Sequence, residues 1–187
     1  MRDENAYVKV TRVLGPFSGL GKIPAHILDN AARRGTRVHL ACDALVLPRS
    51  PGYISENPDD DGYVMSFMKW YENKKFIPKP PRFFCDDLML TGECDMIYED
   101  ERGLVLVDLK TPATESKTWP LQGSAYSYLA KKAGYDIKAI EFIRLMKTGG
   151  APKVYNYTEN FELFKSYLYI YRTHFEKENQ ENYLDYL

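Results

Sequence analysis

The stretch "GECDMIYEDERGLVLVDLKTP" (residues 92–112) decides the fold, because it holds two strand-forming runs on either side of a polar turn. The turn "EDERG" is centred near Glu101 and Arg102, and Asp95 and Asp108 lie at equal distances from that centre. An antiparallel hairpin of this symmetry places the two aspartates opposite one another or nearly so, with their Cβ atoms about 5 Å apart. We therefore expect two carboxylates to lie close together in this hairpin.

The second strand carries charged residues where a core strand is normally apolar. Period-two alternation places Asp108 and Lys110 on one face, and Val107 and Leu109 on the other. Two carboxylates this close repel one another unless a cation lies between them. Lys110 supplies one positive charge, whereas a divalent metal satisfies both carboxylates better, and oxygen ligands favour Mg²⁺ or Mn²⁺. The alternative interpretation is a structural Asp108–Lys110 ion pair on an exposed sheet face.

Further helical and strand-forming segments surround the hairpin. Helices are expected over residues 22–35 (opening near Pro24 and stopping at Gly35), 36–47 (with Thr36 as N-cap), 63–75, 121–134 and 160–180. Strands are expected over residues 82–90, 93–98, 104–110, 137–146 and 153–157. Residues 48–62 are predicted to form a turn-rich surface loop with a solvated acidic run. We predict one α/β domain over residues 1–187, with an N-terminal helical segment and a C-terminal helix.

Composition excludes several classes of function. The chain of 187 residues has 25 basic and 26 acidic residues and a net charge of −1, which argues against a protein that holds nucleic acid by bulk charge. No apolar run reaches about 18 residues, so no membrane-spanning helix and no membrane partner are expected. The start of the chain has no apolar signal region, and Cys42, Cys85 and Cys94 form no CxxC pair. We expect buried free thiols in a reducing cytoplasm.

Four short motifs carry a resemblance to a known family. They are "GTRVH" with His39, "GECD" with Asp95, "VDLK" with Asp108 and Lys110, and "QGSAY" with Gln122 and Tyr126. In order and spacing, over residues 8–146, they resemble the PD-(D/E)xK nuclease superfamily, specifically its RecB-like exonuclease branch and related phage proteins. The resemblance implies a restriction-endonuclease-like core, a central mixed β-sheet flanked by helices. Because no cysteine follows Cys94, the iron–sulfur cluster of some RecB-like exonucleases is not expected.

The resemblance also implies a metal site. Its ligands for Mg²⁺ or Mn²⁺ are His39, Asp95, Asp108 and the main-chain carbonyl of Leu109. The alternative for His39 is a hydrogen-bonded helix histidine, with Asp43 one turn further on. Three further acids are candidates for this site, which leaves the number of metals open: Glu93, Asp86 and Asp87.

Catalytic roles follow from the same resemblance. Lys110 is expected to orient the attacking water or to stabilise the transition state, while Gln122 and Tyr126 hold the lysine and the DNA backbone in place. The alternative for the last two is a surface glutamine beside a core tyrosine.

Candidate DNA contacts lie in two other segments of the sequence. Arg33, Arg34, Arg37 and Lys117 are candidates for phosphate contacts. Trp119 either stacks on a base or packs in the core.

These features predict a metal-dependent nuclease that hydrolyses DNA, an exonuclease of phage or mobile-element recombination and repair type. A recombination or helicase protein is an expected partner, and the host cytoplasm is the expected location if the chain is phage-encoded. Two alternatives are a structure-specific or RNA-directed endonuclease, and a non-cleaving nucleic-acid-binding or assembly module. Polarity, strand preference and oligomeric state are left open by the motifs.

Overall fold

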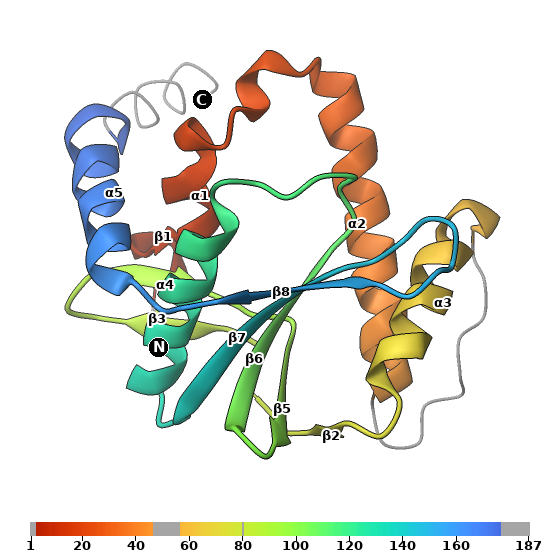
Figure 1. The fold of residues 1–187 in the computed structure, drawn as a ribbon. Helices are drawn as coiled ribbons and strands as arrows, with labels where there is room; N and C mark the ends of the chain where they lie inside the picture. The colour runs from red at the N-terminus through yellow and green to blue at the C-terminus, as the bar shows by residue number, and fades with distance from the viewer. Residues whose placement is uncertain (1–2, 47–56, 80, 177–187) are drawn as a thin grey trace.

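The computed structural model describes residues 3–46, 57–79 and 81–176, and it contains two β-sheets flanked by helices (Figure 1). The helices are η1 (Glu4–Ala6), α1 (Val10–Leu14), η2 (Gly15–Phe17), η3 (Leu20–Lys22), α2 (Ala25–Val46), α3 (Pro58–Tyr71), α4 (Trp119–Lys132) and α5 (Phe161–His174). The strands are β1 (Val8–Lys9), β2 (Lys75–Phe76), β3 (Phe83–Cys85), β4 (Leu90–Gly92), β5 (Met96–Asp100), β6 (Gly103–Lys110), β7 (Ile137–Arg144) and β8 (Lys153–Tyr157). The predicted α/β class with a mixed sheet is confirmed.

The larger sheet has the order β2-β5-β6-β7-β8. Strands β5 and β6 form the predicted antiparallel hairpin, and α4 connects β6 to the parallel strand β7. The expected symmetry about Glu101 and Arg102 is confirmed along the ladder from the pair Asp100 and Gly103 to the pair Met96 and Val107.

The hairpin ladder changes at Asp95. The Asp95 N–H donates to the Val107 carbonyl at 3.0 Å, although Val107 is already the partner of Met96. Two residues of one strand thus meet one residue of the other, as in a β-bulge. Asp95 is therefore near Asp108 rather than directly opposite it.

The smaller sheet has the order β1-β4-β3. The prediction of one strand over residues 82–90 is wrong, because β3 and β4 are separate strands joined by a turn over residues 86–89. Asp86 and Asp87 lie in that turn, and Met89 has a positive φ of 39°. Paired aspartates favour turns over strand interiors, which explains the break.

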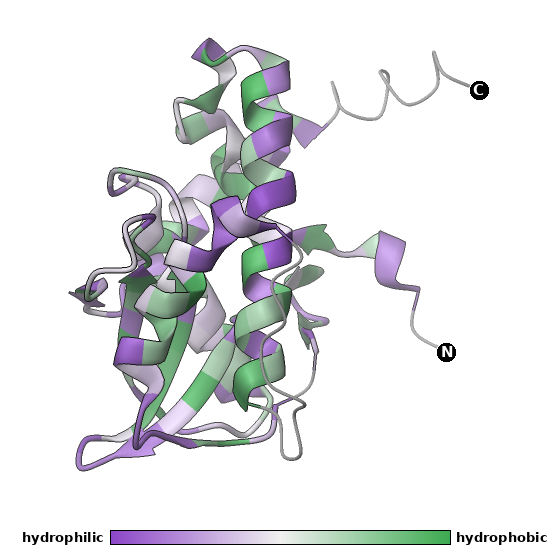
Figure 2. Ribbon diagram, turned by 90° about the vertical axis from the view of Figure 1, so that its right-hand side faces the viewer, coloured by the Kyte–Doolittle hydropathy of each residue, from purple (hydrophilic) through white to green (hydrophobic). Residues whose placement is uncertain are grey.

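Helix α2 runs unbroken through Gly35, so the prediction of two helices with Thr36 as an N-cap is wrong. The Thr36 hydroxyl instead donates to the Ala32 carbonyl at 3.2 Å, as inside a helix. One glycine costs a helix only about 1 kcal/mol relative to alanine. Burial of Val38 and Cys42 on one face outweighs that cost. Figure 2 shows hydrophilic and hydrophobic turns alternating along this helix.

Helix α3 begins earlier than predicted. The Asn57 side chain accepts the Asp59 N–H at 3.1 Å, and the acidic run forms the first turn, where carboxylates are favourable. Asp60 in this run is buried and pairs with Arg37 at 2.6 Å, so the prediction of a solvated acidic loop is wrong here. Residues 48–56 of that loop, residue 47 of the predicted second helix and residues 177–180 of the predicted last helix lie outside the described residues.

Two hydrophobic cores cover the two faces of the larger sheet. One packs α1, α4, α5 and the smaller sheet against Leu106 and Phe142, and the other packs α2 and α3 against Val107 and Leu109. In Figure 1, α4 and α5 lie on the left of the sheet and α2 and α3 on the right. The predicted alternation along residues 104–110 is confirmed. Among the described residues, no helix is long and apolar enough to cross a membrane.

Two helix glycines provide a test of this packing with effects of opposite sign. A Cβ at Gly123 would lie 2.7 Å from Ile140 Cγ2, whereas the nearest atom at Gly35 is Thr111 Oγ1 at 3.9 Å. We expect Gly123→Ala to lower the free energy of unfolding by about 1–3 kcal/mol through overpacking. Gly35→Ala should raise it by about 0.5–1 kcal/mol through helix propensity. Urea unfolding measures both, and two changes of the same sign would contradict this packing.

Candidate functional site

The candidate site lies where β6 ends and β5 begins. Asp108 and Lys110 are among the last three residues of β6, and Asp95 directly precedes β5. His39 comes from the middle of α2, on one face of the sheet, while Gln122 and Tyr126 come from α4 on the other. Helices on both faces of the sheet thus bring polar and ionisable side chains to the C-terminal end of its central strand, β6.

Asp95 forms the first contact cluster. Its Oδ1 is 3.0 Å from His39 Nδ1, and its Oδ2 accepts the Leu109 N–H at 2.5 Å. The Asp95 carboxylate thus accepts a hydrogen bond from the β6 backbone just beyond Met96 and Val107, the last regular pair of the ladder. Both Asp95 oxygens are therefore fixed in direction.

The electrostatics of this pair favour an imidazolium and a carboxylate. Burial acts to lower the pKa of His39, but the charge and hydrogen bond of Asp95 outweigh it and raise that pKa to about 9. Burial acts to raise the pKa of Asp95, and His39 together with the Leu109 N–H holds it below its ordinary value. The raised pKa keeps the His39 imidazole protonated near neutral pH. A metal that ligates His39 must displace a proton from the ring, so metal binding is coupled to proton release.

Asp108 and Lys110 form the second contact cluster. Lys110 Nζ lies 2.5 Å from Asp108 Oδ2, and the Asp108 side chain is buried. The Lys110 ammonium thus provides a positive charge and a hydrogen-bond donor to this buried carboxylate. Burial, together with the nearby Asp95 charge, raises the pKa of Asp108 to about 6 in spite of the opposing Lys110 charge.

Helix α4 fixes the lysine. Lys110 Nζ donates to Gln122 Oε1 at 3.0 Å, and Gln122 Nε2 donates to the Tyr126 hydroxyl at 2.9 Å. The ammonium also lies 5.0 Å from the centre of the Phe142 ring. Gln122 is buried, so the alternative of a surface glutamine is wrong. The i,i+4 spacing of Gln122 and Tyr126 on α4 therefore allows a chain of two hydrogen bonds that ends at Lys110.

The donors fit an oxygen-preferring divalent metal in kind: two carboxylates, an imidazole and nearby backbone carbonyls. As they stand, these side chains pair with one another. Among the described residues, no three His, Cys, Asp or Glu side chains form a ready metal-binding group. The repulsion between the Asp95 and Asp108 carboxylates is the observation that favours a cation, because a positive charge near both would relieve it.

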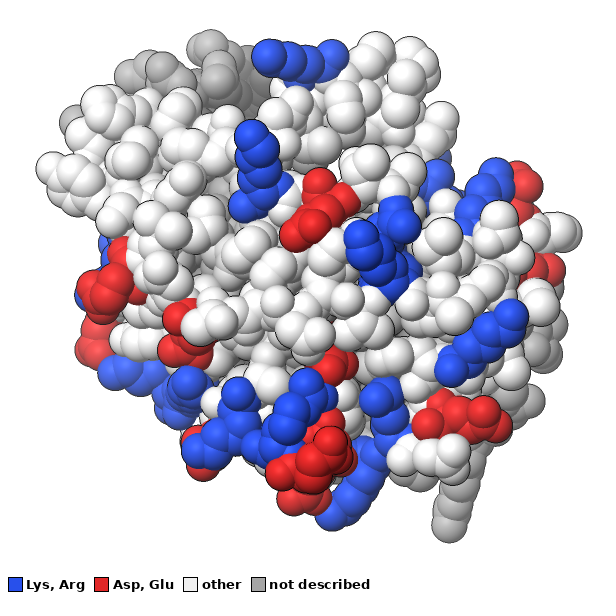
Figure 3. Space-filling model, viewed as in Figure 1, with Lys and Arg blue, Asp and Glu red and all other residues white. Residues whose placement is uncertain are grey.

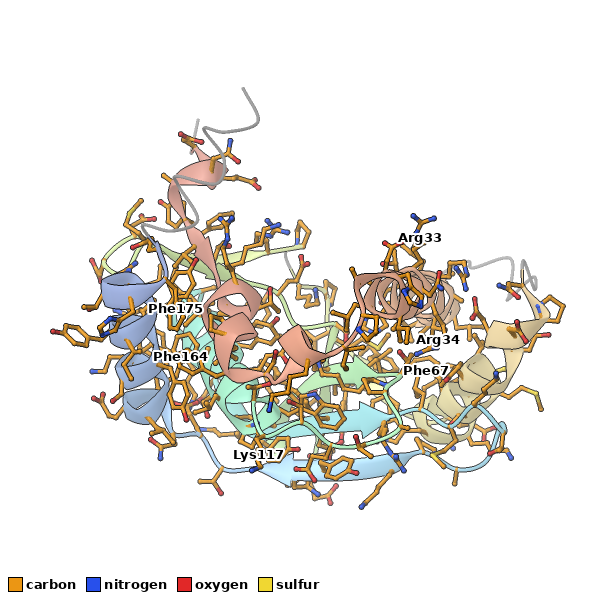
Figure 4. All side chains as sticks on the ribbon, turned by 90° about the horizontal axis from the view of Figure 1, so that it is seen from above. Arg33, Arg34, Phe67, Lys117, Phe164 and Phe175 are labelled. Atoms are coloured by element: carbon orange, nitrogen blue, oxygen red, sulfur yellow. The ribbon has the colours of Figure 1, made fainter. Side chains whose placement is uncertain are left out.

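The predicted DNA-contacting residues do not form one patch. Arg33 is paired with Asp29 at 2.9 Å on the α2 surface, and the Arg34 guanidinium lies 5.5 Å from the centre of the Tyr63 ring. Arg33 and Arg34 lie well apart from Lys117, which is on the loop before α4 (Figure 4). Figure 3 likewise shows scattered basic side chains on this face instead of a continuous basic surface.

Arg37 is already occupied by Asp60, as described above. Its guanidinium therefore joins α2 to the first turn of α3. A phosphate contact by Arg37 would have to compete with this carboxylate.

The additional acids and the tryptophan have other contacts. Glu93 lies 3.5 Å from Arg82, Asp87 lies 3.6 Å from Lys132, and Asp86 accepts the Tyr7 hydroxyl at 2.5 Å. Trp119 is buried against Phe142 and Tyr155, as the packing alternative predicts. The three cysteines are free and buried, as expected.

Two further residues lie near the site: the sequence offers Asp43 only in the alternative interpretation of His39, and it does not single out Arg144. Asp43, one turn after His39, has its pKa raised to about 6 by burial and by the Asp95 charge. Arg144 ends β7 in register with Lys110 and donates to the Ala113 carbonyl of the loop before α4. Arg144 had a signal in the sequence, because the ends of parallel strands meet at one edge of a sheet.

The raised pKa of Asp43 predicts a pH-dependent gain from removing its charge. An acid whose folded pKa is raised destabilises the fold increasingly as the pH rises from 3.8 to about 6. In metal-free buffer at pH 8, we expect Asp43→Asn to raise the free energy of unfolding by well under about 3 kcal/mol, because Asp43 is partly exposed and solvent screens its charge. The gain should vanish near pH 4.

Asp29→Asn is the matched control on the same helix. Its exposed ion pair with Arg33 should contribute less than about 0.5–1 kcal/mol at either pH. Denaturant unfolding at pH 4 and pH 8 measures both variants. An equal effect of Asp43→Asn at the two pH values would contradict the assigned environment of this carboxyl.

The cluster as a whole joins an imidazole, two carboxylates and an ammonium at one edge of a mixed sheet. Neither models of known protein families nor curated proteins give a match to this sequence. The functional proposal is therefore drawn from the chemistry of these side chains.

Proposed function

We propose that this protein is a metal-dependent nuclease that hydrolyses DNA phosphodiester bonds, with Mg²⁺ or Mn²⁺ as cofactor. The observation that supports it most is the buried Asp108 carboxylate, which lies 2.5 Å from the Lys110 ammonium and close enough to Asp95 for the two negative charges to repel one another. A divalent cation at this point would satisfy both carboxylates. The proposed protein ligands are His39, Asp95, Asp108 and the Leu109 carbonyl.

The arrangement of elements is compatible with a restriction-endonuclease-like core of the PD-(D/E)xK superfamily. Three of the proposed ligands (Asp95, Asp108 and the Leu109 carbonyl) belong to the β5–β6 hairpin, the following helix carries Gln122 and Tyr126, and the next strand runs parallel to β6. Helix α2 supplies His39 from the opposite face. We propose the RecB-like branch from the order of the four motifs along the chain.

The side chains divide the work of phosphodiester hydrolysis. A bound divalent metal lowers the pKa of a bound water and offsets charge on the phosphate. Lys110 donates hydrogen bonds to the attacking water or to the phosphate oxygens, where charge develops. Gln122 holds the Lys110 ammonium in one direction, and the Tyr126 hydroxyl holds Gln122 in turn. This fixed orientation is what electrostatic stabilisation of a transition state requires.

Digestion of linear and closed-circular DNA tests the proposal. Each substrate is incubated with purified protein in Mn²⁺ and in EDTA. Metal-dependent loss of linear DNA, with the circle intact, is the result expected of the exonuclease that we propose. Cutting of both substrates would support the endonuclease alternative. No cutting and no metal binding would overturn the nuclease proposal and favour a non-cleaving nucleic-acid-binding module, in which the cluster is a network of ion pairs.

A further inference from the structure

A cavity of about 820 Å³ opens directly beside Lys110 and Gln122. One wall comes from α1, η2, η3 and Ile23, and the other from the loop over residues 112–118 and the start of α4. In Figure 1, the segment that follows α1 passes above the loop that precedes α4. The cavity is therefore continuous with the proposed catalytic site but lies outside its metal ligands.

The two walls differ in chemistry. The N-terminal wall is apolar and includes Phe17, Leu20 and Ile23, of which Leu20 is 49% exposed and Ile23 is 39% exposed. Phe17 is held from behind by edge-on contacts with Tyr167, at 4.8 Å between ring centres, and with Phe175. A rigid ring and two exposed aliphatic side chains thus face the cavity.

The opposite wall is mostly polar. It has the hydroxyls of Thr114, Ser116 and Thr118, the ammonium groups of Lys117 and Lys110, and the apolar side chains of Pro112 and Trp119. Its one carboxylate, Glu115, accepts the Tyr157 hydroxyl at 2.7 Å, which directs it toward β8. The wall therefore offers hydrogen-bond donors and the Lys117 ammonium beside the proposed catalytic site, while the Lys110 ammonium is paired with Asp108.

A nucleotide combines the two chemistries that these walls complement. Its base has flat apolar faces, and its phosphate is an anion that accepts hydrogen bonds. The volume lies in the range of about 300–1,000 Å³ that is usual for small-ligand sites. Base faces are covered in a stacked duplex, and only an unpaired nucleotide can present one to Phe17, Leu20 and Ile23.

We propose that this cavity is a subsite for an unpaired nucleotide next to the scissile phosphate, so that the protein acts on single-stranded DNA or on unpaired DNA ends. The inference rests on the proposed function and specifies its substrate class. Leu20 and Ile23 are the specificity-determining side chains, and Lys117 is the phosphate contact at the rim.

Binding of single-stranded DNA, measured without cleavage, tests the subsite. The probe is a fluorescein-labelled dT12 oligonucleotide, and its anisotropy is followed in EDTA beside that of a blunt duplex of the same length. We expect tighter binding of dT12 than of the duplex. Because the variant removes apolar surface that a base would cover, Leu20→Ser/Ile23→Ser should weaken dT12 binding by about tenfold, equivalent to about 1.4 kcal/mol. Duplex binding should change less than twofold.

Leu40→Ser is the matched control, because Leu40 is 63% exposed on α2 and does not line the cavity. It should leave dT12 affinity unchanged. Lys117→Ala is a second, independent variant at an exposed position, and it should lower the salt slope of dT12 binding by about 0.7. An unchanged dT12 affinity in the double variant, or equal binding of the duplex and the single strand, would overturn the subsite.

The outcomes separate this inference from the proposed function. Cleavage that requires Mn²⁺, together with unchanged dT12 binding by the double variant, would remove the subsite and leave the nuclease. Loss of dT12 binding in the double variant, without any cleavage by the wild type, would keep the subsite and remove the nuclease.

Discussion

Asp108→Asn is expected to remove the proposed Mn²⁺ site and leave the protein folded. The substitution keeps the shape of a buried side chain and removes the negative charge that lies beside Lys110 and Asp95. Loss of an outer contact to a metal ligand already weakens metal affinity by about 10–100-fold, so loss of a ligand should weaken it by at least about 100-fold. Titration calorimetry with Mn²⁺ measures the affinity directly.

Thermal unfolding provides a second reading of the same variant. Mn²⁺ at 100 times its dissociation constant should stabilise the wild type by about 2.7 kcal/mol, and Asp108→Asn should show almost none of this gain. Asp100→Asn is the matched control, since Asp100 lies at the far end of the same hairpin and pairs with Arg102. Equal Mn²⁺ affinity in Asp108→Asn and the wild type would contradict the assigned metal site.

Lys110→Met is expected to lower the rate of cleavage by about 10²–10³-fold without loss of Mn²⁺ binding. Methionine keeps an unbranched chain against Phe142 and Trp119 and removes the ammonium. Single-turnover cleavage at saturating Mn²⁺ measures this effect separately from metal affinity.

The same variant should show a dependence of stability on metal. Without the ammonium, the Asp108 carboxylate is a buried charge with no cation, and loss of one partner of a buried pair costs about 3–5 kcal/mol. Metal-free Lys110→Met should therefore unfold more easily than the wild type, and Mn²⁺ should restore part of the difference. The control is Lys138→Met, which removes a surface pair with Asp136 and should change neither property. Cleavage by Lys110→Met at the wild-type rate would contradict the catalytic role of Lys110.

The hairpin could be predicted from the sequence because its signals are local. Residues 96–107 alternate strand formers around a two-residue turn, and the register follows from turn length and alternation alone. The bulge at Asp95 has no such signal, since it depends on the Asp95 side chain accepting the Leu109 N–H. The local pattern therefore predicts a regular pairing of Asp95 with Asp108, which the bulge prevents.

The helix errors have a common physical cause. Gly35 resembles a helix stop in the sequence, but contacts of α2 with α3 and the sheet hold the helix through it. The acidic run after Asn57 resembles a loop, but Asp60 pairs with Arg37 across 23 positions of sequence. Partners distant in sequence override local propensity in both places.

The candidate site divides in the same way. The spacing of Gln122 and Tyr126 on one helix face could be read from the sequence, as could the shared strand face of Asp108 and Lys110. The places of Asp43 and Arg144 could not be read so directly, because each depends on how a helix or a neighbouring strand packs beside the hairpin. The ion pair between Arg37 and Asp60 likewise depends on how α2 packs against α3.

The most direct test of the central claim is the initial rate of cleavage of end-labelled linear DNA as Mn²⁺ is raised from zero in the presence of wild-type protein and of Asp108→Asn. We predict a rate that is absent in EDTA, rises to saturation with Mn²⁺ in the wild type, and stays at background in the variant. Cleavage that persists in EDTA, or that rises equally in Asp108→Asn, would contradict the assignment of these carboxylates to a metal-dependent nuclease site.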